Sequence, residues 1–479
     1  MAWKKAMTGL LLAGLMASPA AAFAEAIPLR GIVEGFYGTP WTTTDRMDIL
    51  GFCGEHGLNA YIYAPKDDPY HRDKWREPYP KKKLKELASL VEKARENRVK
   101  FIFAVSPGLD FHYTILRGQH DKKVLLEKLE SVYAIGVRDF AIFFDDIDLK
   151  ESDGKGQAEL LNWLDEHFVK RHDGVSPLIT VPTEYYRENM VDKGGRVKPY
   201  TEEFSQNIRK DVLVLYTGDG VVCPGISEEQ LAQADNVYGR HLGIWWNYPV
   251  TDYMEQKLAL GPVERLPRSS EIPAIFFNPM KYEELSKIAL ATGADYANDP
   301  DHYEPQASWE RAIKAQYGKL SEDMMCFAGQ SQHLENSWAN VGRPDGGKLR
   351  AAMDALWKSW PEGASADKDW DDVQKQISEL QQASRRLLQE LPENQLSECR
   401  PQLQQMERIA KADQIALHLM KSIRDGDGKE AKKQLSALKK RHRAILKAEK
   451  KALISDKAAK AFLDEVIKYA DSVYENGKK

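Results

Sequence analysis

The sequence predicts an α/β protein, a (β/α)₈ TIM barrel followed by an all-α helical domain. Three observations support this fold class. Eight short apolar runs recur at intervals of about 30 to 40 residues, amphipathic stretches separate them, and strand-like runs stop near residue 303. We place the barrel at residues 27–303 and the helical domain at residues 304–479.

The eight runs are rich in β-branched and aromatic residues, and most are continuously apolar, which is typical of strands buried on both faces. A doubly wound open sheet is the alternative, but its G-x-G-x-x-G phosphate turn is absent after the first run. Helical spacing separates the runs, for example in Leu84–Arg95 and Lys122–Tyr133. The predicted strands are Arg30–Glu34, Ala60–Tyr63, Lys100–Val105, Phe140–Phe144, Leu178–Val181, Val212–Tyr216, Gly243–Trp246 and Ala274–Phe277.

Beyond residue 303 the composition shifts to Lys, Glu, Gln, Ala and Leu, and apolar residues recur at helical spacing. The segment Lys432–Lys451 is dense in lysine and arginine, interleaved with leucine. A solvated helix face is the favoured interpretation, and a surface for a charged partner is the alternative. The stripes are Val373, Ile377, Leu380 and Leu387, then Leu403, Met406, Ile409 and Leu417, then Phe462, Leu463, Val466, Ile467 and Ala470.

Residues 1–24 are predicted to be a signal peptide, with Lys4 and Lys5 before an apolar stretch and Ala22-Phe23-Ala24 at its end. An uncleaved anchor is the alternative. We therefore expect an exported protein, periplasmic or secreted, without membrane insertion after signal cleavage. Four widely spaced cysteines allow three full pairings, and buried free thiols are the favoured interpretation.

Charge composition argues against a binder of duplex DNA or heparin, and no nucleic acid is expected as a partner, because 68 Lys and Arg face 72 Asp and Glu, for a net charge of −4. A small net charge still allows a local basic patch, and no basic run stands out before the C-terminal third. No metal site is predicted, since the histidines stand singly and no H-E-x-x-H pattern occurs. His71 is the one histidine that we consider as a residue of the cleft, because it follows closely on Lys66.

Polar side chains gather where the predicted strands end, the edge that carries the active site in barrels of this class. The sharpest feature is Asp145-Asp146, directly after the apolar string Phe140–Phe144. Neighbouring carboxylates repel each other, so one can carry a proton while the other remains ionised. Glycoside hydrolysis needs both a proton donor and a negative charge. Aromatic residues near these strand ends suit a sugar pocket. A surface turn or a carboxylate pair for Mg²⁺ are the alternatives.

Five segments together resemble glycoside hydrolase family 84, the β-N-acetylglucosaminidases that include O-GlcNAcase and proteins described as hyaluronidases. The resemblance covers about residues 29–303 and implies a retaining exo-hydrolase for terminal GlcNAc. The substrate's own acetamido oxygen would be the nucleophile, through an oxazoline intermediate. The segments are Val33–Trp41, Tyr63–Asp68, Phe144–Asp146, Pro182–Tyr185 and Trp245–Asp252.

The resemblance assigns the two aspartates separate roles. Asp145 would orient and polarise the acetamido N–H, and Asp146 would protonate the leaving oxygen and later act as base. Gly35 would offer its backbone to a sugar hydroxyl. Lys66 would donate to the ring hydroxyls, with an ion pair to Asp67 or Asp68 as the alternative.

Further binding residues follow from the same resemblance. Tyr185 would bind the acetamido oxygen, and Trp245 would help to wall the acetyl pocket. Asn247 would bind near the leaving oxygen, Asp252 the 4- and 6-hydroxyls, and Asn278 a hydroxyl or the glycosidic oxygen. Thr217 is a weaker candidate, because a threonine at a strand end is often a structural cap.

The resemblance implies GlcNAc-bearing glycans or glycoproteins as partners, and it implies no cofactor. A homodimer through the helical domain is also considered. Two other functions stay open at this point: an endo-glycosidase of the hyaluronidase or chitinase type, and a carbohydrate-binding barrel without turnover.

Overall fold

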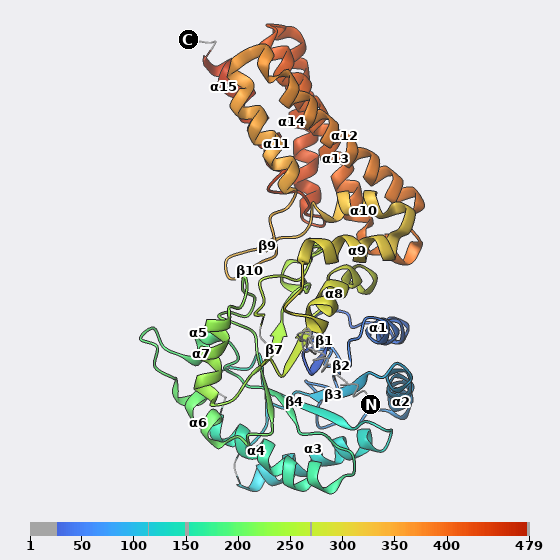
Figure 1. Cartoon of the computed structure of the whole chain (residues 1–479), viewed down its shortest axis with the longest axis vertical. Helices are drawn as coiled ribbons and strands as arrows, with labels where there is room; N and C mark the ends of the chain where they lie inside the picture. Colours follow the sequence, from blue (N-terminus) through green and yellow to red (C-terminus); the bar gives the residue numbers. More distant parts are fainter. Residues whose placement is uncertain (1–25, 114, 149–152, 269–270, 477–479) are drawn as a thin grey trace, which may run out of the picture.

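The computed structural model describes residues 26–476 except 114, 149–152 and 269–270, so the predicted signal peptide lies outside the described residues. The chain forms a barrel with a long helical region on one side of it (Figure 1). Within the described residues, no helix is both long and apolar enough to cross a bilayer.

Eight parallel strands close into a barrel in sequence order, with β1 paired to β8. The predicted strands are confirmed within one residue at each end. Phe144, predicted as the last residue of the fourth strand, lies just outside it. The strands are β1 Leu29–Glu34, β2 Ala60–Tyr63, β3 Lys100–Val105, β4 Asp139–Phe143, β5 Ile179–Val181, β6 Leu213–Tyr216, β7 Gly243–Trp246 and β8 Ala274–Phe277.

Both faces of the strands are buried, which explains the continuous apolar strings of the sequence. Along β2, Ile62 packs inside the barrel, whereas Tyr61 and Tyr63 belong to the outer core beneath the helices. This alternation follows the two-residue period of a strand. The barrel helices are α1 Thr43–Glu55, α2 Lys81–Glu96, α3 Ile115–Tyr133, α4 Gly154–His167, α5 Arg187–Met190, α6 Pro199–Asn207, α7 Glu228–Tyr238 and α8 Glu283–Asn298.

The connection from β7 to β8 departs from a regular repeat. In its described part it holds a 3₁₀ turn, Asp252–Met254, in place of a longer helix. Prolines at 249, 262, 267 and 273 account for this, because proline removes a helical N–H and clashes with the preceding turn. Its middle instead contacts the chain beyond the barrel, where Leu260 N–H donates to Ser331 O (2.8 Å).

The region after the barrel is helical, as predicted, and its apolar stripes are buried except at Ile467. One addition interrupts it, a short antiparallel hairpin of β9 Leu334–Glu335 and β10 Asn340–Val341. The four cysteines are free, and Cys326 is the one that is only partly buried. The helices are α9 Pro305–Tyr317, α10 Ser321–Ala328, α11 Gly347–Ser359, α12 Asp367–Glu390, α13 Glu393–Arg424, α14 Gly428–Glu449 and α15 Ala459–Asn476.

Candidate active site

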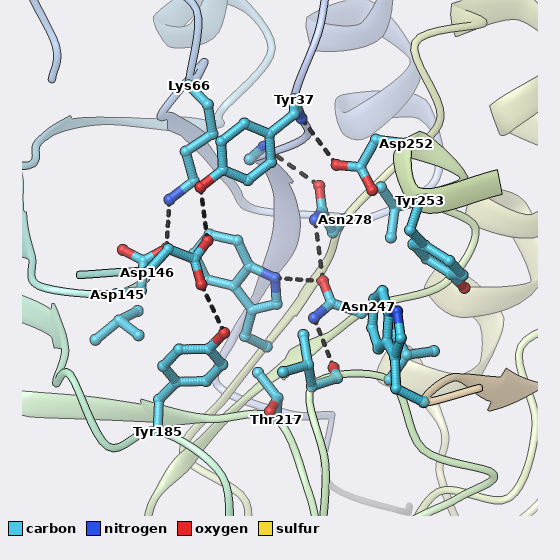
Figure 2. A pocket seen from close by; sticks show the side chains of 17 residues that line it. Tyr37, Lys66, Asp145, Asp146, Tyr185, Thr217, Asn247, Asp252, Tyr253 and Asn278 are labelled. Carbon is cyan, nitrogen blue, oxygen red and sulfur yellow. Dashed lines mark hydrogen bonds and ion pairs between the residues drawn. The ribbon is translucent and has the colours of Figure 1, made fainter. Parts of the chain in front are cut away.

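A cavity of about 480 Å³ lies where the barrel strands end (Figure 2). The structure brings all ten residues selected from the sequence to this one cavity, although seven different strand ends supply them. Their individual roles stay predictions. They are Gly35, Lys66, Asp145, Asp146, Tyr185, Thr217, Trp245, Asn247, Asp252 and Asn278.

Asp145 and Asp146 both line the cavity because the backbone turns sharply between them. Successive side chains of a strand point to opposite faces, so an extended chain would direct one of the two away. Asp146 instead has a left-handed conformation, with φ = +55°. This conformation costs a non-glycine residue roughly 1–2 kcal/mol. Arg72 Nη2 donates to the Asp146 carbonyl (2.9 Å) and thereby helps to hold the turn.

The two carboxylates have different surroundings. Lys66 Nζ forms an ion pair with Asp145 Oδ2, while Asp145 Oδ1 is buried and has no hydrogen-bond partner within the described structure. Asp146 accepts hydrogen bonds from the hydroxyls of Tyr37 and Tyr185, each at 2.8 Å (Figure 2). The expected alternative for Lys66 is wrong, because its partner is neither Asp67 nor Asp68.

A tryptophan and two amides form a hydrogen-bonded wall of the cavity. Trp245 Nε1 donates to Asn247 Oδ1 (2.8 Å), and Asn278 Nδ2 donates to the same oxygen (3.0 Å). Asn278 Oδ1 in turn accepts from Gly35 N–H (3.3 Å). A Cβ on Gly35 would lie 2.4 Å from Trp245 Cζ2, so glycine is required there for close packing against the indole ring.

Asp252 and Thr217 occupy other edges of the cavity. Asp252 Oδ2 accepts from Tyr37 N–H (2.8 Å), and burial raises the pKa of Asp252 above its usual value. Thr217 Oγ1 donates to Gly220 O (2.9 Å), which makes it a cap of the local turn as well as a cavity residue.

Three aromatic residues of the cavity were not selected from the sequence: Tyr37, Tyr253 and Trp338. Tyr37 belongs to the segment Val33–Trp41 that carries the family resemblance, so it could have been predicted as a cavity residue from its position between Gly35 and Trp41. Trp338 was not foreseeable, because it comes from the hairpin beyond the barrel. Its ring is half exposed and lies 5.0 Å from that of Tyr253, between ring centroids.

A triad of charges around the buried Lys257 joins the barrel to the base of the Trp338 hairpin. Lys257, on the β7–β8 connection, pairs with Asp345 (2.7 Å) and with Asp456 (2.6 Å). Asp345 Oδ1 also accepts the backbone N–H groups of Gln332 and His333, at the entry to the hairpin. The carboxylates of Asp345 and Asp456 raise the pKa of Lys257 against the effect of its burial.

Two other groups lie outside the cavity. His71 is fully buried, with Nδ1 2.8 Å from Ala104 O, and burial lowers its pKa to about 3, so the expectation that it lines the cleft is wrong. Asp48, Glu283 and Glu284 have a spacing suited to a metal ion, but Lys287 pairs with all three. We therefore assign no metal to this cluster.

Comparison with known families gives two matches along the chain. Residues 30–329 match the model of a family described as beta-N-acetylglucosaminidase, and residues 348–463 match one described as hyaluronidase post-catalytic domain-like. The first match spans all eight barrel strands except Leu29, and every cavity residue except Trp338.

Individual relatives agree with these matches. Protein O-GlcNAcase of Rattus norvegicus is 31% identical over 298 residues, and that of Mus musculus is 31% identical over 282 residues. These cover 59% and 56% of the chain but only 31% and 30% of the relatives, so the chain spans about a third of their length.

Solved structures resemble nearly the whole chain. The structure named CpGH84B has a TM-score of 0.88 at 38% identity and covers 92% of this chain and 77% of its own. A mutant O-GlcNAc hydrolase of Thermobaculum terrenum has a TM-score of 0.84 at 25% identity, covering 94% of this chain and 96% of its own.

Proposed function

Because the chain belongs to the family of β-N-acetylglucosaminidases, a family of glycoside hydrolases, we propose that it removes terminal GlcNAc with net retention of configuration. The substrate's acetamido oxygen attacks the anomeric carbon in this proposal, and an oxazoline intermediate follows. GlcNAc on glycans or glycoproteins is the proposed substrate class, by analogy with the relatives named O-GlcNAcase.

The unpartnered oxygen of Asp145 carries the proposal. A buried polar atom without a partner is uncommon in folded proteins and needs an explanation. Asp145 Oδ1 is such an atom within the described structure, while Lys66 fixes the other oxygen. An acetamido N–H would supply the missing donor, and the aspartate would thereby increase electron density on the acetamido oxygen that attacks.

In this proposal Asp146 acts on the same sugar from the adjacent position. It protonates the leaving oxygen in the first step and accepts a proton from water in the second. Tyr185, which donates to Asp146 in this structure, would turn to the acetamido oxygen when the sugar binds. Tyr37 keeps its bond to Asp146 and so preserves the carboxyl orientation.

A series of 4-nitrophenyl β-GlcNAc substrates with mono-, di- and trifluorinated acetyl groups tests the nucleophile. Fluorine withdraws electrons from the acetamido oxygen, so kcat should fall steeply along the series if that oxygen attacks. Rates that are independent of fluorination would contradict the proposal and favour a nucleophile from the protein. Cleavage only inside long polymers would favour an endo-glycosidase, and sugar binding without turnover a silent barrel.

Two variants test the separate roles of the aspartates. Asp146→Asn should lose about 10²–10⁴ in rate for poor leaving groups and much less for acidic phenols, because acid assistance matters least there. Asp145→Asn should slow all leaving groups to a similar extent. Asp67→Asn is the matched control, since this aspartate is adjacent to Lys66 but exposed, and its activity should stay within twofold.

We also propose that the mature protein is exported after cleavage behind residue 24, on the composition of residues 1–24. Amino-terminal sequencing of the protein from the native host's periplasm or medium tests this. A retained Met1 in the cell pellet would contradict it.

A further inference from the structure

Helices α14 and α15 belong to the helical region beyond the barrel (Figure 1). Side chains of these two helices line a groove of about 890 Å³ outside the candidate active site. Four of its lining side chains are basic and none is acidic. The remaining lining residues are apolar or small and include one aromatic ring. The lining residues are Lys432, Leu435, Ser436, Lys439, His442, Arg443, Ile467 and Tyr474.

The basic residues share one face of α14, because they stand at positions i, i+7, i+10 and i+11 of a helix with 3.6 residues per turn. A different face, with Ala431, Leu438 and Ile445, is buried. This helix carries eight Lys and Arg against two Glu, although the whole chain has a net charge of −4. The small net charge of the whole chain therefore does not reflect the strongly basic character of this helix.

The basic side chains of the groove differ in how far they are neutralised. Lys439 pairs with Asp471 (2.6 Å) and His442 with Asp464 (2.7 Å), both on α15. No ion pair of Lys432 or Arg443 occurs within the described residues, and both are exposed. The ammonium of Lys432 lies 5.8 Å from the ring centroid of Tyr474. The two ends of the groove thus carry basic side chains that form no ion pair with the described residues.

We propose that this groove binds an acidic glycan, a chain of sulfated or carboxylated sugars. Lys432 and Arg443 are eleven positions apart, roughly 16 Å along the helix axis, which is long enough for several sugar rings. Sulfate or carboxylate groups would pair with the basic residues, and Tyr474 with Leu435 and Ile467 would contact the apolar faces of the rings. The concave shape is unsuited to a flat bilayer surface.

The proposal goes beyond hydrolysis in the barrel, because this site would hold a long anionic substrate or matrix while the barrel acts elsewhere on it. Its failure and that of the proposed function are separable. Small chromogenic GlcNAc substrates do not reach the groove, so variants of the groove should retain full activity on them. Loss of that activity would contradict the separation of the two sites.

Heparin oligosaccharides titrated into the full chain at low salt test the site by calorimetry. We expect binding that weakens as salt rises, because exposed charges are screened. The double variant Lys432→Ala/Arg443→Ala should bind at least tenfold more weakly. The matched control Lys440→Ala/Arg441→Ala removes the same charge from the same helix outside the groove and should stay within threefold.

Several outcomes would overturn the proposal. These are no binding, equal loss in both double variants, or binding of single-stranded DNA of the same length as tight as that of heparin. A self-association that the groove variant abolishes would also overturn it, because a second copy would then occupy the groove. Neutral chitin oligosaccharides should bind far more weakly than heparin, and equal binding would contradict the role of charge.

Discussion

The substitution Gly35→Ala offers a sharp test of how closely the cavity wall is packed. An added Cβ would lie 2.4 Å from Cζ2 and 2.7 Å from Cη2 of Trp245. Since carbon atoms in contact prefer about 3.5–4.0 Å, the indole ring must retreat by roughly 1 Å. Trp245 is buried and bonded to Asn247, which is also bonded to Asn278, so the displacement should spread along this wall.

A misplacement of about 1 Å at a reacting centre can reduce the rate on the order of 100-fold. We therefore expect kcat/KM for 4-nitrophenyl β-GlcNAc to fall about 100-fold. Overpacking should also lower the free energy of unfolding by about 1–3 kcal/mol. Gly51→Ala is the matched control, because Gly51 lies within α1 and its Cβ would meet no atom within 4 Å. It should leave activity unchanged and stabilise the helix by up to about 1 kcal/mol.

A double-mutant cycle identifies the cause. Trp245→Phe removes the two ring atoms that meet the added Cβ, so Gly35→Ala should cost much less in that background than in the native one. A Gly35→Ala protein within threefold of native activity, or the same loss in both backgrounds, would refute the steric reasoning.

Two further predictions concern an aromatic residue of the cavity and a buried acid. Trp338→Ala should lower kcat/KM by about 2- to 10-fold for substrates with aromatic or peptide aglycones, because one aromatic contact is worth about 0.5–1.5 kcal/mol. The same variant should leave kcat/KM for methyl β-GlcNAc unchanged. An equal loss for all aglycones would contradict this role of Trp338. Burial raises the pKa of Glu283 from 4.5 to about 8, so the folded state binds this proton more tightly than the unfolded state does. The free energy of unfolding should therefore fall as the pH rises between these two values. The fall should be at most about 1.4 kcal/mol per pH unit. In urea unfolding at pH 5 and 8.5, Glu283→Gln should reduce that fall most. Glu284→Gln should reduce it much less, because Glu284 only adds to the raised pKa of Glu283. Identical pH slopes in all three proteins would be evidence against the raised pKa.

The eight strands were predictable because both of their faces are buried, so most of them appear in the sequence as nearly continuous apolar strings. The helical stripes were predictable for a similar reason, since each buries one side of a long helix. Ile467 departs from its stripe because it faces the open groove between α14 and α15. The hairpin was not predictable, because two-residue strands are too short for a periodic pattern.

The candidate site was also predictable only in part, since its residues could be predicted but their contacts could not. The residues of the cavity could be predicted from the ends of the strands, since parallel strands in a closed barrel direct their carboxyl ends to one edge. The partners of those members depended on tertiary contacts. Tyr37 and Asp146 stand 109 positions apart, and the left-handed turn at Asp146 has no signal in its immediate sequence. The pairing of Lys66 with Asp145 in place of its neighbouring acids has the same origin.

The triad of Lys257, Asp345 and Asp456 sets a limit on how the molecule could be dissected. A chain cut at residue 303 would keep every strand of the barrel but lose both acids that neutralise a buried ammonium, and would lose Trp338 as well. An unpaired buried charge of this kind costs several kcal/mol. The smallest unit that folds and retains the proposed activity should therefore include the linker before α15, so an isolated barrel would be a poor guide to the function of the chain.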